Sequence, residues 1–136
     1  MKKTALALLV IVLSCLGVGW TQQAESFNEC SKQFPREMIR VSSGVLETQV
    51  VNKVLPEASD LKSAPDSDVQ IVVRSYQMGK LCVKAVKGDP ALFERSETAA
   101  RKWKIRPYML DGAPIIMESR FVFRYRKGKL SVRFED

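Results

Sequence analysis

The fold is decided by residues 89–125, which read DPALFERSETAARKWKIRPYMLDGAPIIMESRFVFRY. Asp89 is a good N-cap, because its carboxylate can accept the free N–H groups of a first helical turn. Pro90 suits the first helical position, where its missing N–H costs nothing. A stripe of apolar and small residues follows at helical spacing, with charged residues on the other faces: Leu92, Ser96, Ala99 and Trp103, with Phe93 and Ala100 beside them. We therefore predict one amphipathic helix that sits close to a sheet and ends at the large ring of Trp103.

Turns and strands flank this helix on both sides. After it, Pro107 prevents helix continuation, residues 110–114 form a turn, and residues 115–125 alternate as a long strand whose Phe face should meet Trp103. Residues 130–134 read as a short extra strand. Before the helix, we expect strands at 39–41, 45–55, 69–74 and 80–86, the first two separated by a turn at Ser42-Ser43-Gly44. The chain thus predicts an α+β fold, a small antiparallel sheet with one main helix packed on it.

The same residues carry a family resemblance. The run from Gly88 to Pro114 resembles the C-terminal domain of TonB, the energy transducer of Gram-negative envelopes. The residues that carry it are Gly88, Asp89, Pro90, Leu92, Phe93, Ala99, Ala100, Arg101, Trp103, Pro107, Gly112 and Pro114. The resemblance covers roughly Ile39 to Arg126, and it implies a β-β-α-β domain with extra strands at its N-terminal side. Two positions depart from the family pattern: Leu55-Pro56 replaces Tyr-Pro, and Asp68 stands where a Gly is expected.

The N-terminal segment reads as an export leader. Lys2 and Lys3 precede an apolar run that is short for a membrane span, which needs about 20 residues. Three outcomes stay open: ordinary cleavage between Gly19 and Ala24, lipidation of Cys15 at a lipobox-like Val12–Cys15, or a retained anchor that associates with the membrane. All three place the protein in the periplasm or on the periplasmic face of a membrane. We divide the chain into a leader or anchor (1–24), a polar arm (25–38) and a TonB-like domain (39–136).

The cysteines permit one disulfide in such an oxidising compartment. If Cys15 is removed or lipidated, Cys30 and Cys82 remain as a pair. Their bridge would contribute roughly 4 kcal/mol on the chain-entropy model. Two unrelated cysteines are the alternative, since connectivity cannot be read from sequence.

Composition excludes several classes of site. The chain has no histidine, which removes Ser-His-Asp and Cys-His nucleophile systems and His-based metal sites, and its three cysteines lack zinc-type spacing. We therefore expect no enzyme, no catalytic residue, no cofactor and no metal site. The formal net charge of +7, with basic residues concentrated late in the chain, favours an anionic partner or is simply a solvated basic face. Export argues against nucleic acid as that partner.

The resemblance implies a function in binding. TonB C-terminal domains pair the strand after the helix with a short segment of an outer-membrane transporter, and an open sheet edge supports such pairing in general. Here that strand would comprise Ser119, Arg120, Phe121, Val122, Phe123, Arg124 and Tyr125. Alternatively, Leu130–Phe134 folds back and covers the same edge. The partner would be an envelope protein, such as the N-terminal segment of a TonB-dependent transporter, in energy-coupled transmembrane transport.

A second reading keeps the fold without energy transduction. Full transducers cross the periplasm with a long Pro-rich spacer, whereas here about 20 residues separate the leader from Ile39, a reach of roughly 70 Å when extended. A periplasmic or lipid-anchored envelope adapter is therefore the alternative function.

Overall fold

The computed structural model of this chain describes residues 38–76 and 79–136. The predicted leader, Cys15 and Cys30 lie outside this part. Its strands are β1 (Met38–Arg40), β2 (Val50–Asn52), β3 (Ser67–Ser75), β4 (Leu81–Lys87), β5 (Lys104–Ile105), β6 (Tyr108–Leu110), β7 (Ala113–Arg126) and β8 (Lys129–Arg133). Its helices are α2 (Ser43–Gln49), α3 (Phe93–Arg101) and the 3-10 turns η1 (Ala58–Ser63) and η2 (Pro90–Leu92).

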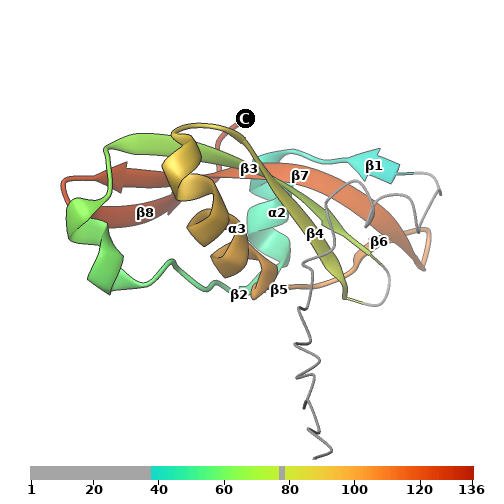
Figure 1. Cartoon of the computed structure of the whole chain (residues 1–136). Helices are drawn as coiled ribbons and strands as arrows, with labels where there is room; N and C mark the ends of the chain where they lie inside the picture. Colours follow the sequence, from blue (N-terminus) through green and yellow to red (C-terminus); the bar gives the residue numbers. More distant parts are fainter. Residues whose placement is uncertain (1–37, 77–78) are drawn as a thin grey trace, which may run out of the picture.

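The sheet is built around β7, its longest strand (Figure 1). On one side, β3 pairs antiparallel with Met117–Tyr125, and β4 lies outside β3. On the other side, β1 pairs with Ile116–Glu118 and β8 with Val122–Arg126, while β6 forms a hairpin with the start of β7. The predicted α+β class and the order β3-β4-α3-β7 are confirmed. The expectation of a purely antiparallel sheet is wrong at β1, which runs parallel to β7.

The main helix forms as its sequence predicts, with a shorter α-helical part. Asp89 caps it through its carboxylate, which accepts the Ala91 N–H at 2.9 Å, but Pro90 starts the 3-10 turn η2 and α3 begins only at Phe93. The predicted stripe is buried, with Ser96 fully enclosed; its other members are Leu92, Ala99, Ala100 and Trp103. The chain leaves α3 at Arg101 and then pairs Lys104–Ile105 with β2. Pro107 lies between β5 and β6, several residues after the end of the helix.

Trp103 is the centre of the core between helix and sheet. Its ring stacks on Phe121 with centroids 4.2 Å apart and meets the edge of Phe123 at 5.9 Å. Its indole N–H donates to the Val54 carbonyl at 2.8 Å, which ties the extended segment before η1 to the end of the helix. The expectation that the Phe face of the long strand meets Trp103 is therefore confirmed.

A buried hydroxyl pair completes this core. The Ser96 and Tyr125 hydroxyls lie 2.7 Å apart, so α3 and β7 share a hydrogen bond inside the core. Burial raises the pKa of Tyr125, although the Ser96 hydrogen bond and the charge of Arg95 partly offset this effect. The small side chain at position 96 lets the helix approach β7 closely enough for this bond.

The expected strand over 45–55 is wrong except at Val50–Asn52, which form β2, and its first half belongs to helix α2. Ser42 caps this helix, its hydroxyl accepting the Val45 N–H at 3.4 Å, and Leu46 is fully buried under it. The Ser43 N–H and hydroxyl both donate to the Asp136 carboxylate at 2.9 Å. The contact between Ser43 and Asp136, which are far apart in sequence, supports the start of α2. Residues 45–49 therefore form a helix despite their local preference for a strand.

We expect this contact to make stability depend on pH. Hydrogen bonds from the Ser43 backbone and hydroxyl lower the pKa of Asp136. A lowered folded-state pKa stabilises the protein above the unfolded value of about 3.9, and this contribution is lost as pH falls through the folded pKa. Asp136→Ala should therefore lower the melting temperature at pH 7, and the gap from wild type should close near pH 3.

The check is thermal unfolding by circular dichroism at both pH values. Glu57→Gln, which removes an exposed carboxylate on the segment before η1, is the control and should not show this pattern. An equal gap between Asp136→Ala and wild type at pH 7 and pH 3 would contradict the role of the Asp136 charge.

The remaining segments follow the expected turns with local additions. The 69–74 and 80–86 strands are confirmed as β3 and β4, with Val69, Ile71 and Val73 buried on the core side. Asp111 and Gly112 both have positive φ, which confirms the turn before β7, but the preceding residues form β6 rather than irregular chain. The segment between the predicted strands 45–55 and 69–74 contains η1.

Candidate functional site

The predicted partner-binding strand lies inside the sheet. Ser119 to Tyr125 belong to β7 and pair with β3 along their whole length. On the opposite side, β8 pairs with Val122–Tyr125, so the alternative in which Leu130–Phe134 folds back is the arrangement in the structure. The side chains of Phe121, Phe123 and Tyr125 fill the core. Both sides of this part of β7 are already paired, so an incoming strand could pair there only if β8 detached.

The short interval of β7 between β1 and β8 is also engaged. The Val41 N–H donates to the Glu118 carbonyl at 3.0 Å, and the Ser119 hydroxyl donates to the Val41 carbonyl at 3.0 Å. The carboxylate of Glu118 is buried and forms ion pairs with Arg74 at 2.7 Å and Arg40 at 3.2 Å, which lie on the two neighbouring strands. This cross-strand arrangement holds β1 in place beside β7, so the interval is part of the framework.

The sheet ends at β4 on its other side. Within residues 38–76 and 79–136, no strand pairs with the outer edge of β4. In an antiparallel pair, backbone groups point alternately toward and away from the neighbouring strand. The Tyr76 N–H donates to the Lys80 carbonyl, and the Ala85 N–H points away from β3 to a side chain of α3. The outward-facing backbone groups therefore belong to the alternate residues Leu81, Val83 and Ala85.

One of these outward groups already has an acceptor. The Ala85 N–H donates to Glu97 Oε1 at 2.9 Å, and Arg101 donates to Glu97 Oε2 at 3.0 Å. Glu97 and Arg101 are one helical turn apart, so both project from the flank of α3 that faces β4. We call these two residues the α3 clasp. The clasp shows that the β4 edge presents a backbone donor to an acceptor approaching from outside the sheet.

The surroundings of this edge are cationic. Lys84 and Lys87 are exposed on β4, and Lys80 precedes the strand. Arg101 adds a fourth cation, while Glu97 is the acid placed at the edge itself. Lysines on an edge strand discourage pairing with other basic or neutral strands. An acidic strand would meet the opposite electrostatic situation.

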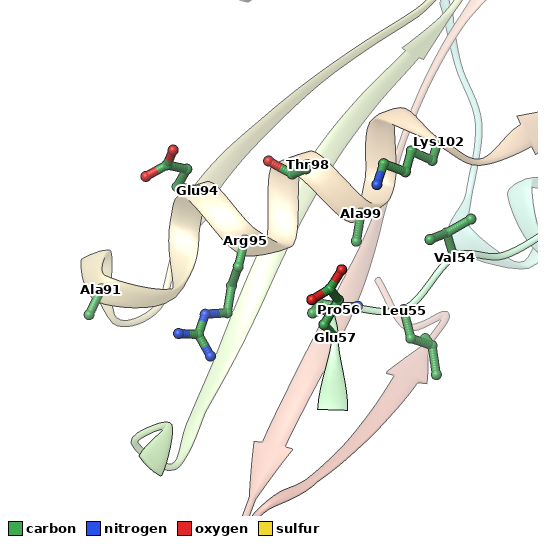
Figure 2. A pocket seen from close by; sticks show the side chains of 10 residues that line it. All are labelled: Val54, Leu55, Pro56, Glu57, Ala91, Glu94, Arg95, Thr98, Ala99 and Lys102. Carbon is green, nitrogen blue, oxygen red and sulfur yellow. The ribbon is translucent and has the colours of Figure 1, made fainter. Parts of the chain in front are cut away.

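A groove lies on the other flank of α3 (Figure 2). Its volume is about 460 Å³, and it runs between the helix and the segment Val54–Glu57. Arg95 and Lys102 line it together with the acidic Glu57 and Glu94, so charges of both signs meet there. Such a mixed lining does not select one class of ligand, and we assign this groove no role.

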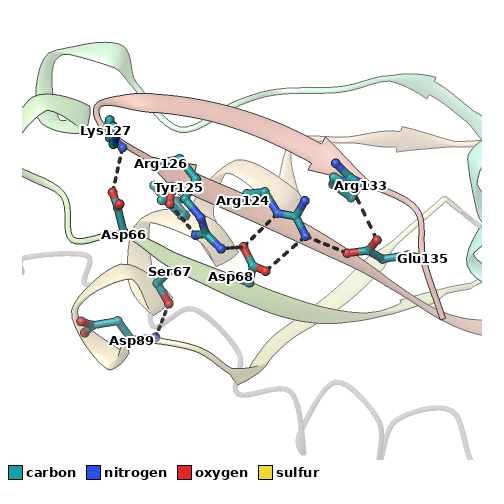
Figure 3. A network of polar contacts seen from close by, with 10 residues as sticks. All are labelled: Asp66, Ser67, Asp68, Asp89, Arg124, Tyr125, Arg126, Lys127, Arg133 and Glu135. Atoms are coloured by element: carbon teal, nitrogen blue, oxygen red, sulfur yellow. Dashed lines mark hydrogen bonds and ion pairs between the residues drawn. The ribbon is translucent and has the colours of Figure 1, made fainter.

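The face of the sheet opposite α3 carries a charged network (Figure 3). Asp68 bridges Arg124 at 3.1 Å and Arg126 at 2.9 Å, and Glu135 links Arg124 to Arg133. Burial of Asp68 opposes its ionisation, but the hydrogen bond and charge of Arg124, assisted by Arg126, outweigh it and lower the pKa of Asp68. Arg124, Arg126 and Arg133 of the basic C-terminal part are therefore paired within the protein. Asp68, at the position where a Gly was expected, contributes these pairs.

Of the cysteines named in the predictions, Cys82 lies within the described residues, and Cys15 and Cys30 lie outside them. Cys82 lies on the face of the sheet away from Val83 and is buried beside Tyr76 and Ile116, as its position in the strand implies. It is disulfide-bonded, and its partner lies outside the described residues, so pairing with Cys30 stays a prediction. Lipidation of Cys15 also falls outside them.

Among residues 38–76 and 79–136, no cluster of His, Cys, Asp and Glu side chains could hold a metal ion. In the same part of the chain, no helix has the length and apolar character needed to cross a membrane. The chain matched no protein-family model, no curated protein and no solved structure.

The β4 edge and the α3 clasp were not among the predicted site residues. The predicted binding strand came from family resemblance, in which Arg101 is one of the motif residues, and Glu97 was grouped with the charged residues on the other faces of the helix. Two signals were present in the chain. The i, i+4 spacing of Glu97 and Arg101 predicts their ion pair. A β-β-α-β chain whose last strand lies beside the first leaves the second strand at an edge.

Proposed function

We propose that this protein is an envelope protein with a TonB C-terminal type of β-β-α-β domain. It binds a short extended segment of a partner by strand pairing and acts in energy-coupled transmembrane transport. The partner class is the N-terminal segment of a TonB-dependent outer-membrane transporter, met in the periplasm. The protein is not an enzyme and uses no cofactor. Support comes from the helix-and-turn motif around Trp103 and from the outer edge of β4, with which no strand of the described residues pairs.

The binding edge in this proposal is β4. The observation that carries it is the Ala85 N–H, which points out of the sheet and is held by a side-chain carboxylate. Leu81 and Val83 repeat the same outward orientation along the strand. An extended segment beside β4 would gain main-chain hydrogen bonds from these residues, which is how strand addition obtains its affinity.

The same binding without energy transduction is the second candidate. It is favoured by the short interval between the expected leader and Ile39, about 20 residues, which reaches roughly 70 Å when fully extended. Both candidates share the binding step, and the experiment below tests that step.

We expect loss of one outward N–H to weaken partner binding. Leu81→Pro removes the Leu81 N–H at the start of an edge strand, a position that tolerates proline. The hydrogen bond it removes contributes about 1 kcal/mol, so affinity should fall about fivefold. Leu81→Ala is the matched control, because it loses the side chain but keeps the N–H. The measurement is isothermal titration of the full chain with transporter N-terminal peptides, and equal affinities of the two variants would count against the β4 edge.

A further inference from the structure

The α3 clasp suggests which kind of segment the β4 edge accepts. Glu97 uses both carboxylate oxygens: one takes the Ala85 N–H, and the other takes the Arg101 guanidinium. Its side chain is 22% exposed and that of Arg101 is 36% exposed, so solvent and a partner can reach both. A carboxylate is therefore already seated at the sheet edge, held by one backbone donor and one cation.

We propose that the β4 edge takes an acidic extended peptide, and that Glu97 holds the place of its carboxylate in the free protein. This inference rests on the strand pairing proposed above and adds the chemistry of the partner. The incoming backbone would take over the Ala85 N–H, and an acidic side chain of the peptide would take over Arg101. Glu97 would then swing into solvent.

The charges along the edge support an acidic partner. Three lysines accompany β4, namely Lys80, Lys84 and Lys87, and Arg101 stands beside them. With Glu97 displaced, Arg101 loses the carboxylate it pairs with in the free protein and can pair with an acidic side chain of the segment. Complementary charge then speeds encounter and disfavours basic strands, which makes the edge selective.

The clasp also explains how the free edge is protected. An unpaired edge strand is a template for unwanted pairing, including with a second copy of the chain. Glu97 satisfies the Ala85 N–H, which would otherwise be available to any strand. A partner must displace the Glu97 carboxylate from the Ala85 N–H. Segments whose contacts with β4 are weaker than this internal contact therefore bind poorly.

The test uses two labelled synthetic peptides, acetyl-GTVEVTG-amide and its Glu-to-Gln counterpart, titrated into the full chain at low salt by fluorescence polarisation. The wild type should bind the acidic peptide about fivefold more tightly than the neutral one, as one exposed charge pair allows. Arg101→Gln should reduce this preference to less than twofold, because it removes the cation that pairs with the carboxylate at the Ala85 position. Glu97→Ala should bind the acidic peptide several-fold more tightly, because the internal competitor is gone.

Glu94→Ala is the matched control, because it removes the same charge from an exposed position of α3 one turn before Glu97, while the Ala85 N–H stays bonded to Glu97. Glu97→Gln, which keeps an acceptor for Ala85, should fall between the wild type and Glu97→Ala. Equal binding of the two peptides, or no difference between Glu97→Ala and Glu94→Ala, would overturn the clasp and leave strand pairing standing. Failure of every variant to bind either peptide would overturn strand pairing and the clasp together.

Discussion

Trp103→Ala should destabilise the protein by about 3–5 kcal/mol, the range for deleting a large buried aromatic side chain. Trp103 is 4% exposed and contacts Phe121 and Phe123 of β7. Its removal leaves a cavity between α3 and the sheet and also frees the Val54 carbonyl that the indole N–H holds. The measurement is equilibrium unfolding in urea, monitored by circular dichroism.

Trp103→Phe separates packing from the hydrogen bond. This variant keeps an aromatic ring against Phe121 but cannot donate to Val54, so it should cost about 1–3 kcal/mol, clearly less than Trp103→Ala. A cost below about 1 kcal/mol for Trp103→Ala would show that the helix end is not packed as described.

Gly88→Ala should have the second largest effect, about 2–4 kcal/mol. Gly88 has φ of +121°, and a Cβ there would lie 2.6 Å from the Asp68 carbonyl oxygen and 2.9 Å from the Val69 Cα. Both are backbone atoms of β3, so they cannot move without disturbing the strand. Urea unfolding measures the cost.

Gly79→Ala is the control for this effect. Gly79 also has a positive φ, +75°, but a Cβ there meets no atom within 4 Å. It should therefore show backbone strain alone, about 1 kcal/mol. Equal costs for the two variants would mean that the close approach of Gly88 to β3 is not a determinant of stability.

Local signals in the sequence predicted the centre of this fold. Asp89, the buried stripe of α3 and the alternating Phe residues of β7 each act through near neighbours or simple periodicity, and each is confirmed by burial or hydrogen bonding. The turn at Gly112 likewise follows from local backbone chemistry. These elements specify the helix, the long strand and their packing.

Contacts between distant residues decided what the sequence analysis missed. Helix α2 replaces a predicted strand because Asp136 holds its first turn and Leu46 fills the core. The parallel pairing of β1 places Arg40 beside Glu118, which also meets Arg74 of β3. Neither interaction leaves a periodic pattern in the chain, so neither was visible before the strands were in register.

The candidate site illustrates the same limit. Sequence resemblance directed attention to Ser119–Tyr125, but whether a strand is an edge depends on the arrangement of the whole sheet. In the part of the chain that the structure describes, β3 and β8 flank β7, and no strand pairs with the outer side of β4. Glu97 becomes a candidate site residue only in that arrangement, because it accepts the backbone N–H of Ala85, and no sequence pattern predicts this contact.

Residue-resolved amide exchange of the full chain, with and without transporter N-terminal peptides, tests the central claim most directly. If the partner segment pairs with β4, the Leu81 and Val83 amides should gain protection when peptide is present, while those of β7 should change little. Protection confined to Ser119–Tyr125, or no protection at either strand under saturating peptide, would contradict the account.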